Sequence, residues 1–585
     1  VPLGEYGLED RVYEIAAAGA SIARRVADEY ESRFVAGSIG PGTKFPTLGQ
    51  IRYADLRDQF EIEAAGLIDG GVDLIIIETQ FDLLAVKAAM NAARRAMRSS
   101  GRDLPLQTQV TIELTGRMLP GTEIAAAVAT LESLGADVIG INCATGPVEM
   151  YEPVRYLTQN ATVPISIIPN AGLPSVVDGE MHYDLGAQEM AEHLTTFVSE
   201  YGVSIVGGCC GTTPQYIETI IDAVRPQDPA ERTPTHAPAV TSTYSAVQLE
   251  QETSFLIIGE RTNANGSKAF REAMLEGDID ACVAIGEGQV AEGAHLVDLC
   301  VDYVGRDGVA DIDTLAQRFA TEVTAPIVID STEPEVMQSA LERIGGRSVL
   351  NSANLESGDG DGSRLDRVLS LAKEHGAAVI CLLIDERGQA RDLEWKMEVA
   401  HRLYEIATTR YGLAPEDLIF DALTFPLSTG DDDLRGDAME TIEAVRRIKA
   451  ELPGTHTVLG VSNVSFGLRP AARRILNSVF LHECVEAGLD AAIIHAGKIT
   501  PLAQIDPEHR TICLDLIYNR KTVDYDPLEA LLEAFATATE MSSRSDPLEG
   551  LGLEERIEQR IVTGNAVGLE DDLDAALVDH EAISI

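Results

Sequence analysis

The sequence is poor in cysteine and in long hydrophobic runs. Eight cysteines are spread over 585 residues, which excludes a disulfide framework and fits a reduced, cytoplasmic setting. No apolar stretch reaches the roughly 18 residues that a membrane span needs, so no membrane association is expected. Residues 1–10 have neither a basic start nor an apolar core, so they do not form a signal peptide.

Positive charge is also scarce. The chain has 8 lysines and 37 arginines against 94 acidic residues, a formal charge of −49. Such a chain repels phosphate groups, which excludes nucleic acid as a partner. An acidic, lysine-poor surface is typical of adaptation to a salty cytoplasm, and it carries no information about a reaction.

The first part of the chain alternates apolar segments with amphipathic ones. A helix is expected within residues 1–33, where Leu8, Val12 and Ile15 recur at helical spacing. Six short strands follow, separated by helices, a pattern typical of a parallel α/β fold. They are predicted at residues 34–40, 73–79, 106–113, 137–144, 164–171 and 204–211. A closed (β/α)8 barrel has eight strands, so this domain, residues 1–224, is two strands short.

The second part begins after a break in the pattern. Residues 225–254 are rich in Pro, Thr, Ala and Ser without periodicity, which indicates a linker. Residues 255–545 then contain eight predicted strands, enough for a complete (β/α)8 barrel. They lie at residues 255–263, 295–302, 326–332, 348–354, 378–385, 418–425, 456–463 and 490–496. Residues 546–585 form an acidic tail with helices starting at Leu553 and Leu569.

The predicted fold class is therefore α/β. It consists of two (β/α)8 TIM-type barrels in tandem, the first incomplete, followed by a short helical tail.

Three cysteines stand at predicted strand ends. Cys209 and Cys210 are adjacent, and a strained vicinal disulfide, a pair of buried thiols or a metal site each explains such a pair. Cys143 ends an earlier strand, and parallel strands bring their carboxyl ends to one barrel mouth. Three thiolates with one open position form the ligand set of a catalytic zinc ion, so zinc is the favoured interpretation. Zinc lowers the pKa of a bound thiol, which suits alkylation of a substrate sulfur.

Two polar residues accompany these cysteines. Glu78 follows a fully apolar strand, and its carboxylate is expected to hold a substrate ammonium group. The alternative is a salt bridge to a neighbouring helix. Asn142 precedes Cys143 and is a weaker candidate for the same role.

The predicted strands of the second barrel end in carboxylates and amides. Any single one of these side chains is readily explained as a helix cap, whereas the full set suits a flat heterocycle rich in hydrogen-bond donors, such as a pterin. The set comprises Glu260, Asn263, Asp298, Asp302, Asp330, Ser331, Asn351, Ser352, Asp385, Asp421 and Asn463.

Motifs in both halves resemble those of cobalamin-dependent methionine synthases, in the same order. In the first half the resemblance lies in Ile76-Ile77-Glu78-Thr79-Gln80-Phe81-Asp82, Gly140-Ile141-Asn142-Cys143, Pro169-Asn170-Ala171-Gly172-Leu173-Pro174 and Gly207-Gly208-Cys209-Cys210-Gly211-Thr212-Thr213-Pro214. In the second it lies in Gly259-Glu260-Arg261-Thr262-Asn263, Asp330-Ser331-Thr332, Asn351-Ser352, Asp421-Ala422-Leu423-Thr424-Phe425-Pro426 and Gly460-Val461-Ser462-Asn463-Val464-Ser465-Phe466-Gly467.

The resemblance implies specific roles in the transfer of a methyl group from 5-methyltetrahydrofolate, through cobalamin, to homocysteine, yielding methionine and tetrahydrofolate. Zinc held by Cys143, Cys209 and Cys210 would activate homocysteine, with Glu78 and Asn142 binding the substrate. The pterin would be bound by Glu260, Asn263, Asp330, Asn351, Asp385, Asp421 and Asn463. Asp421 and Asn463 are the expected catalytic residues, Asn463 lying near the N5 atom that carries the methyl group.

Two departures from the family pattern are expected to matter. The opening strand with its Asp-Gly-Ala-x-Gly-Thr motif and the strand after it are missing, and the cobalamin-ligating Asp-x-His-x-x-Gly motif does not occur. The Leu553 helix is similar to the start of the cap over cobalamin. The chain is thus expected to be incomplete at both ends, to bind homocysteine poorly and to need a cobalamin-binding domain in cis or in trans. The alternatives are a folate-binding module without turnover and a zinc homocysteine methyltransferase with another methyl donor.

Overall fold

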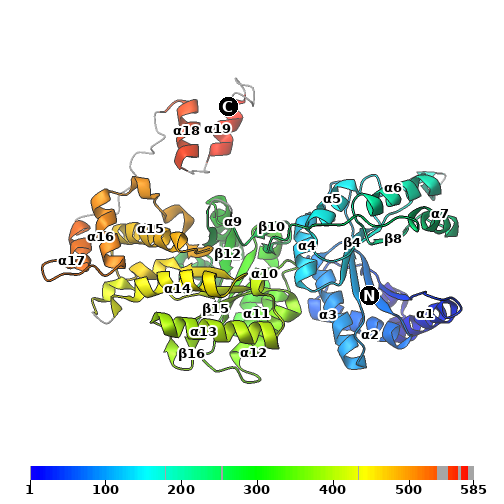
Figure 1. Ribbon diagram of the computed structural model, residues 1–585, viewed down its shortest axis with the longest axis horizontal. Coiled ribbons are helices and arrows are strands. Elements are labelled where there is room, and N and C mark those ends of the chain that lie inside the picture. The colour runs from blue at the N-terminus through cyan, green and yellow to red at the C-terminus, as the bar shows by residue number, and fades with distance from the viewer. Residues whose placement is uncertain are drawn as a thin grey trace.

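Two parallel sheets surrounded by helices make up most of the chain (Figure 1). The computed structural model describes residues 2–177, 179–251, 254–431, 434–536, 551–563 and 568–577. The fourteen strands predicted for the two sheets are confirmed, and the fold is two tandem TIM-type units, the first of them a curled, open half-barrel.

The first sheet has six strands in chain order. They are β1 (Ala36–Ile39), β2 (Leu74–Gln80), β3 (Leu106–Val110), β4 (Val138–Asn142), β5 (Ile165–Ile168) and β8 (Ile205–Val206). All neighbouring pairs are parallel. Its helices are α1 (Val12–Ala27), α2 (Tyr53–Asp69), α3 (Leu83–Ser100), α4 (Ile124–Ser133), α5 (Tyr151–Asn160), α6 (Ala187–Ser199) and α7 (Pro214–Val224). The expected N-terminal helix is α1, preceded by 3-10 turns at Pro2–Tyr6 and Glu9–Arg11.

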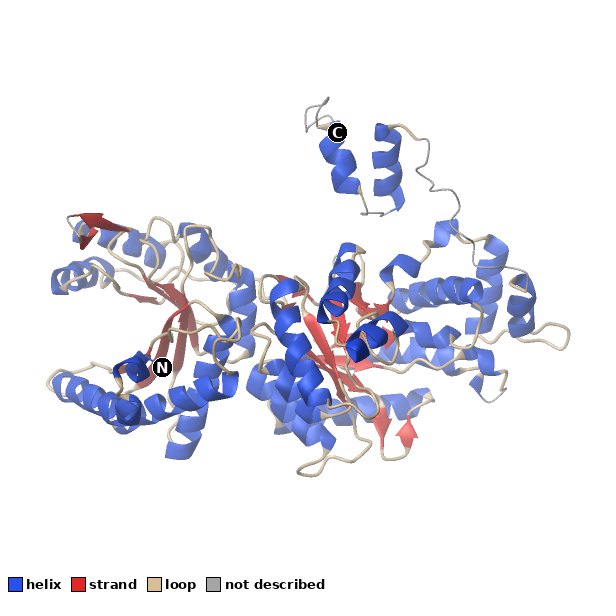
Figure 2. Cartoon of the chain, turned by 180° about the vertical axis from the view of Figure 1, so that it is seen from behind, coloured by secondary structure: helices blue, strands red, loops and turns tan. Residues whose placement is uncertain are grey.

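The first sheet is open among the described residues. Strands β1 and β8 lie at its two edges, and β8 contributes only two residues to its pairing with β5. Figure 2 shows the sheet fanning out between the helices that flank it. Close to these edges Phe34 and Ile205 expose 76% and 36% of their surface. Unpaired strand edges and exposed apolar side chains leave this core less protected than that of a closed barrel.

The second sheet closes on itself. Its strands are β11 (Leu256–Gly259), β12 (Leu296–Leu299), β13 (Ile327–Asp330), β14 (Val349–Ala353), β15 (Ala378–Leu382), β18 (Leu418–Asp421), β19 (His456–Gly460) and β20 (Ala491–Ile494). Strand β20 pairs back with β11, which completes the barrel. The surrounding helices are α8 (Lys268–Glu276), α9 (Ile279–Ala291), α10 (Gly308–Glu322), α11 (Pro334–Leu341), α12 (Arg364–His375), α13 (Leu393–Glu405), α14 (Asp437–Glu451), α15 (Pro470–Glu486), α16 (Pro507–Ile517) and α17 (Pro527–Ala534).

Part of the segment predicted as a linker is structured. Strands β9 (Ala239–Thr241) and β10 (Ala246–Gln248) form an antiparallel hairpin, and Val240 and Leu249 pack into the interior of the second barrel. Both side chains are almost fully buried. The Arg347 guanidinium fixes the hairpin by donating to the Ala239 carbonyl at 2.8 Å. Residues 239–249 therefore close the amino-terminal end of the barrel, opposite its carboxyl-terminal mouth.

Two further hairpins depart from the predicted pattern. Strands β6 (Pro174–Val177) and β7 (Glu180–Tyr183) follow the fifth strand of the first sheet, and β16 (Ile384–Asp385) pairs with β17 (Gly388–Gln389) beyond β15. The expected tail helices are α18 (Leu553–Thr563) and α19 (Leu569–Ala576), which pack on each other away from both barrels (Figure 1). The remaining tail residues lie outside the described ones. Each described helix is either too short or too polar to cross a bilayer.

The two barrels contact each other through a buried cation. Lys87 on α3 is 0% exposed, and its ammonium lies against carbonyls at the end of α11 in the second barrel. It donates to Ile344 O at 2.6 Å and more weakly to Leu341 O at 3.4 Å and Gly346 O at 3.5 Å. Leu341 ends α11, and Ile344 and Gly346 lie in the loop that follows, so Lys87 supplies a donor to these carbonyls across the interface. Burial lowers the pKa of Lys87 to about 7.

The lowered pKa predicts how the stability of the docked barrels depends on pH. Below pH 7 Lys87 is protonated in the folded and unfolded states, and the folded state carries the full cost of the buried charge. Between pH 7 and about 10 the unfolded chain keeps a proton that the folded protein has released, so stability increases by about 1.4 kcal/mol per pH unit. Urea unfolding of Lys87→Met should show a rise that is smaller by this amount. The difference is clearest between pH 7 and 8, because Lys396, whose pKa is lowered to about 8, contributes mainly at higher pH.

Lys268→Met is the matched control, because the Lys268 side chain is 78% exposed and pairs only with Glu272 one helical turn away. It should retain the pH dependence of the unsubstituted protein. Equal pH profiles for Lys87→Met and the unsubstituted protein would contradict the assignment.

The open sheet predicts unequal resistance to proteases. Strand ends and exposed apolar side chains of the first domain open more readily than the closed second barrel, so limited proteolysis should cut within residues 1–224 first. Mass spectrometry of the early fragments tests this, and early cleavage inside residues 255–495 with the first domain intact would refute it.

Candidate functional site

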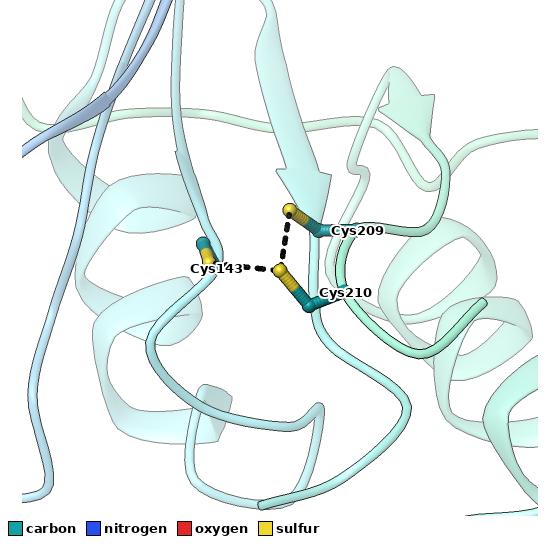
Figure 3. A group of neighbouring side chains, drawn as sticks. All are labelled: Cys143, Cys209 and Cys210. Carbon is teal, nitrogen blue, oxygen red and sulfur yellow. Dashed lines mark hydrogen bonds between the residues drawn. The ribbon is translucent and has the colours of Figure 1, made fainter. Parts of the chain in front are cut away.

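Three cysteine sulfurs meet at the carboxyl end of the first sheet (Figure 3). Cys210 Sγ lies 3.7 Å from Cys143 Sγ and 4.0 Å from Cys209 Sγ, and all three sulfurs lie within 4.8 Å of one another. None of them forms a disulfide. The structure thus brings together the three cysteines that were predicted as metal ligands.

The local backbone positions these thiols. Cys143 follows β4 directly and has a φ of 59°, a left-handed conformation that turns the chain sharply out of the sheet. The loop after β8 is held by the loop after β5. Cys209 N donates to Pro169 O at 2.8 Å, and Cys210 N donates to Asn170 Oδ1 at 3.1 Å. The Pro169–Asn170 segment therefore fixes the adjacent cysteines in register with Cys143.

The thiols strongly influence each other's ionisation. The pKa of Cys143 is lowered to about 5, chiefly because the Cys209 thiol hydrogen-bonds to its thiolate. The pKa values of Cys209 and Cys210 are raised, the first mainly by that same hydrogen bond and the second by burial and by the negative charge on Cys143. Three thiolates at this spacing repel one another, so full ionisation needs a cation among them. The donor set suits Zn²⁺.

Glu78 and Asn142 line the same site. The Glu78 carboxylate accepts a hydrogen bond from Ser38 Oγ at 2.6 Å, and Asn142 Nδ2 lies 3.5 Å from its other oxygen. Asn142 is held by Thr79, whose backbone N–H donates to Asn142 Oδ1 at 2.7 Å, and it also lies 4.0 Å from Cys209 Sγ. No cation of a neighbouring helix pairs with Glu78 among the described residues, so its carboxylate is available to a ligand.

One residue beside the thiols was not predicted. Tyr183, at the end of β7, packs so closely on Gly211 that a Cβ there would lie 2.4 Å from Tyr183 Cγ. The pKa of Tyr183 is raised by burial and by the negative charge of Cys210. The hairpin β6–β7 thereby places a phenol next to the cysteines. Its only sequence signal was a short polar-apolar alternation around the Gly179 turn.

In the second barrel a group of buried acids lies at the ends of β12 and β13. Asn263 Nδ2 donates to Asp298 at 2.9 Å and to Asp330 at 3.0 Å, bridging the two carboxyl groups. Burial and the neighbouring charge raise the pKa of Asp298, and burial raises that of Asp330 to about 6. Asp298 Oδ1 is buried and has no hydrogen-bond partner. The site therefore retains an unfilled acceptor directed at its interior.

A neighbouring pocket contains the two predicted catalytic residues. Its volume is about 460 Å³, and its lining comprises Leu382, Gln389, Asp421, Leu423, Thr424, Phe425, Pro426, Asn463 and Phe466. Burial raises the pKa of Asp421 to about 6. Lys396, a buried cation that the sequence did not single out, donates to the Ala422 carbonyl and lies 5.3 Å from the Phe425 ring. Burial lowers the pKa of Lys396 to about 8.

The other predicted pterin residues lie in different surroundings. Glu260 accepts from Ser462 Oγ at 3.3 Å, which links the ends of β11 and β19. Asn351 pairs in register with Asp330. Asp385 is part of the β16–β17 hairpin, where its carboxylate accepts from Arg387 and from Trp395 Nε1 at 3.0 Å. Its carboxylate is thus engaged by Arg387 of its own hairpin and by Trp395 of α13.

Comparison with known proteins divides the chain in the same way. The family model of homocysteine S-methyltransferases matches residues 2–224, and the model of pterin binding enzymes matches residues 259–495. Both matched regions contain the clusters described above. The solved structure of the metallated homocysteine methyltransferase MmuM from Escherichia coli is 20% identical over 37% of this chain and 74% of its own, with a TM-score of 0.30, a likeness too weak to carry an argument.

Curated relatives match across both domains. The methionine synthase of Mycobacterium tuberculosis is 50% identical over 590 residues, which cover 100% of this chain and 50% of the relative. That of Mycobacterium leprae is 50% identical over 595 residues, covering 100% of this chain and 49% of the relative. The chain therefore spans about half the length of the curated relatives it matches. The chain is thus similar to methionine synthases along its whole length, with a homocysteine S-methyltransferase domain followed by a pterin-binding domain.

Proposed function

We propose that this chain binds homocysteine in its first domain and 5-methyltetrahydrofolate in its second, and serves methyl transfer from the folate to homocysteine. The observation that carries the proposal is the meeting of three cysteine sulfurs within 4.8 Å at one mouth, in a chain whose other mouth holds a buried group of carboxylates and amides. The two curated relatives that are 50% identical to this chain are methionine synthases, which supports the same reaction.

In the first domain Cys143, Cys209 and Cys210 would hold zinc. When bound, zinc supplies positive charge that keeps a substrate thiol ionised at neutral pH. The surrounding residues orient the substrate. The Glu78 carboxylate accepts the ammonium group of homocysteine, and Asn142, held by Thr79, fixes the distance between Glu78 and the sulfurs. Tyr183 covers the cysteines from the side of the β6–β7 hairpin.

In the second domain the carboxylates would bind the pterin. Asp421 accepts paired N–H donors of the ring, while Asn463 lies in the same pocket near the expected position of N5. Glu260, Asn263, Asp330 and Asn351 complete the polar wall, and the free Asp298 oxygen offers a further acceptor. A tertiary amine leaves poorly unless it is protonated, so these groups act by favouring the protonated form of N5 in the transition state. Asp385 is a peripheral member of this set.

Cobalamin would carry the methyl group between the two mouths and would be bound by a domain outside the residues described here, in cis or in trans. This part of the proposal is supported by the family alone.

The test supplies cobalamin from solution. Cob(I)alamin with 5-methyltetrahydrofolate should yield tetrahydrofolate, and methylcobalamin with homocysteine should yield methionine. Folate binding with neither product would indicate a binding module without turnover. Methionine formation only from betaine or S-methylmethionine would indicate a zinc enzyme with another donor, and either result would replace the proposal.

The three thiols predict a metal content. Cys210→Ala removes one thiolate ligand together with its negative charge. Bound zinc should therefore fall from about one per chain to near zero, measured by atomic emission after dialysis. Cys282→Ala, which changes a buried thiol of the second barrel outside any cluster, is the control and should keep its zinc. Unchanged zinc in Cys210→Ala would exclude the site.

The raised pKa of Asp421 predicts pH-dependent folate binding. Above pH 6 the carboxylate is ionised and accepts the pterin N–H groups, whereas below pH 6 it is protonated, so affinity should fall by up to tenfold per pH unit. Asp421→Asn should weaken folate binding by roughly 10–100-fold at pH 7.5, measured by calorimetry. It should also make the pH dependence shallower, the remainder coming from Asp330, whose pKa is likewise raised to about 6.

Asp280→Asn is the control for this measurement. The Asp280 side chain is 85% exposed and pairs with Arg318 on the outer surface of the same barrel. It should bind folate with unchanged affinity and pH profile. Equal affinities for Asp421→Asn and the unsubstituted protein would remove Asp421 from the proposed site.

A further inference from the structure

A second cluster of potential ligand atoms lies at the opposite end of the folate barrel. His456 begins β19, Asp490 precedes β20, and Glu250 follows β10 in the hairpin segment that closes the barrel. One ligand atom from each of these three residues lies within 4.8 Å of the other two. The cluster is made by two neighbouring strands and by a segment that arrives from the other domain.

The unusual member of the cluster is the histidine. His456 is only 2% exposed, and both of its ring nitrogens are buried without a hydrogen-bond partner among the residues that the structure describes. A neutral imidazole has one donor and one acceptor, and leaving both unmatched in a protein interior is unfavourable. Buried polar groups of this kind in folded proteins are normally matched by a water molecule or an ion. The unmatched ring nitrogens therefore indicate that a ligand binds beside His456.

The two carboxylates define which partner fits. Glu250 is exposed and makes no ion pair with a described residue. Asp490 Oδ2 accepts from Thr457 N at 2.8 Å, from Thr457 Oγ1 at 3.0 Å and from Lys449 Nζ at 3.0 Å, so the direction of the carboxylate is fixed. Among the described residues, Oδ1 accepts from Lys449 Nζ alone, at 3.0 Å. Each carboxylate oxygen has more than one lone pair, so Asp490 Oδ1 can accept a further partner. One imidazole nitrogen together with two carboxylate oxygens is a ligand set that suits a divalent metal ion.

We propose that Glu250, His456 and Asp490 form a second metal site, which binds a divalent transition-metal ion such as Mn²⁺ or Zn²⁺ through one imidazole nitrogen and two carboxylate oxygens. This donor set is distinct from the three sulfurs of the first mouth, because carboxylates and imidazole accept harder ions such as Mn²⁺ that thiolates do not select. The site lies at the amino-terminal end of the barrel, away from the pterin pocket, so its role is structural. The ion would fasten the segment between the domains to β19 and β20.

Lys449 sets the strength of the site. Its ammonium also donates to Thr455 O at 3.1 Å, so it stays in place when Asp490 Oδ1 binds an ion through its remaining lone pair. A positive charge this close repels a divalent cation. The site is therefore weaker than its ligand set alone would make it, and removal of the Lys449 charge should strengthen it.

The experiment uses Mn²⁺ as the probe, in the full chain with Cys209→Ser and Cys210→Ser to eliminate the thiolate site. Electron paramagnetic resonance of free Mn²⁺ during titration gives the number of ions bound. The expected result is one bound Mn²⁺ per chain. Glu250→Gln, a change at an exposed position that leaves the fold intact, should weaken binding by at least roughly tenfold. Lys449→Met should tighten binding by roughly tenfold.

Glu231→Gln is the matched control, because Glu231 is an exposed acid of the same interdomain segment outside the cluster. It should bind Mn²⁺ like the parent chain. The proposal is overturned if no Mn²⁺ binds, if Glu250→Gln binds it as tightly as the parent, which would indicate diffuse attraction to the acidic surface, or if a crystal grown with Mn²⁺ shows only water beside His456. Each result is independent of homocysteine or folate turnover.

Discussion

Both candidate sites depend on one geometric constraint, the parallel pairing of neighbouring strands. Parallel register brings every carboxyl end to the same side of a sheet, so residues that follow different strands become neighbours without being close in sequence. In the first domain this constraint brings Cys143 to Cys209 and Cys210 across 66 residues of chain. In the second it joins Asn263, Asp298 and Asp330. The chemistry at each mouth follows from side chains whose charges would not tolerate one another without a ligand.

The two mouths are fixed relative to each other by interactions of a different kind. Lys87 inserts an ammonium from the first domain among carbonyls of the second, and Thr130 Oγ1 lies 3.0 Å from Thr241 Oγ1 in the closing hairpin. Tyr244 O accepts from Glu123 N at 2.8 Å on the other side of the hairpin. These contacts are buried and polar, so they impose a specific docking geometry, whereas apolar packing alone would allow the surfaces to slide.

The sequence carried enough information for the sheets and for the thiol site. Strands such as Leu74–Gln80 are apolar runs that end in polar residues. A cysteine directly after such a run is predicted at a strand end, whatever the exact bounds of the helices between the strands. The hairpins were not predictable, because the apolar residues of β9 and β10 are isolated among Thr and Ser, and their burial depends on a barrel formed by residues that follow. Lys87 was missed for the same reason, since a lysine on an Ala-rich helix indicates exposure until another domain covers it. Asp385 shows the opposite failure: the barrel strand ends earlier, at Leu382, and Asp385 lies in the hairpin that follows, where Arg387 two residues later occupies its carboxylate.

The hairpin at residues 239–249 has a consequence for where the second barrel begins as a physical unit. Val240 and Leu249 share a core with Leu256, Ile258, Val458 and Ala491, so the barrel's lower interior is completed by chain that precedes its first strand. A fragment cut at Phe255 would leave those side chains facing water and the Arg347 guanidinium without the Ala239 carbonyl. The smallest fragment that keeps these side chains buried therefore starts upstream of Ala239, within the segment whose composition alone indicates a linker.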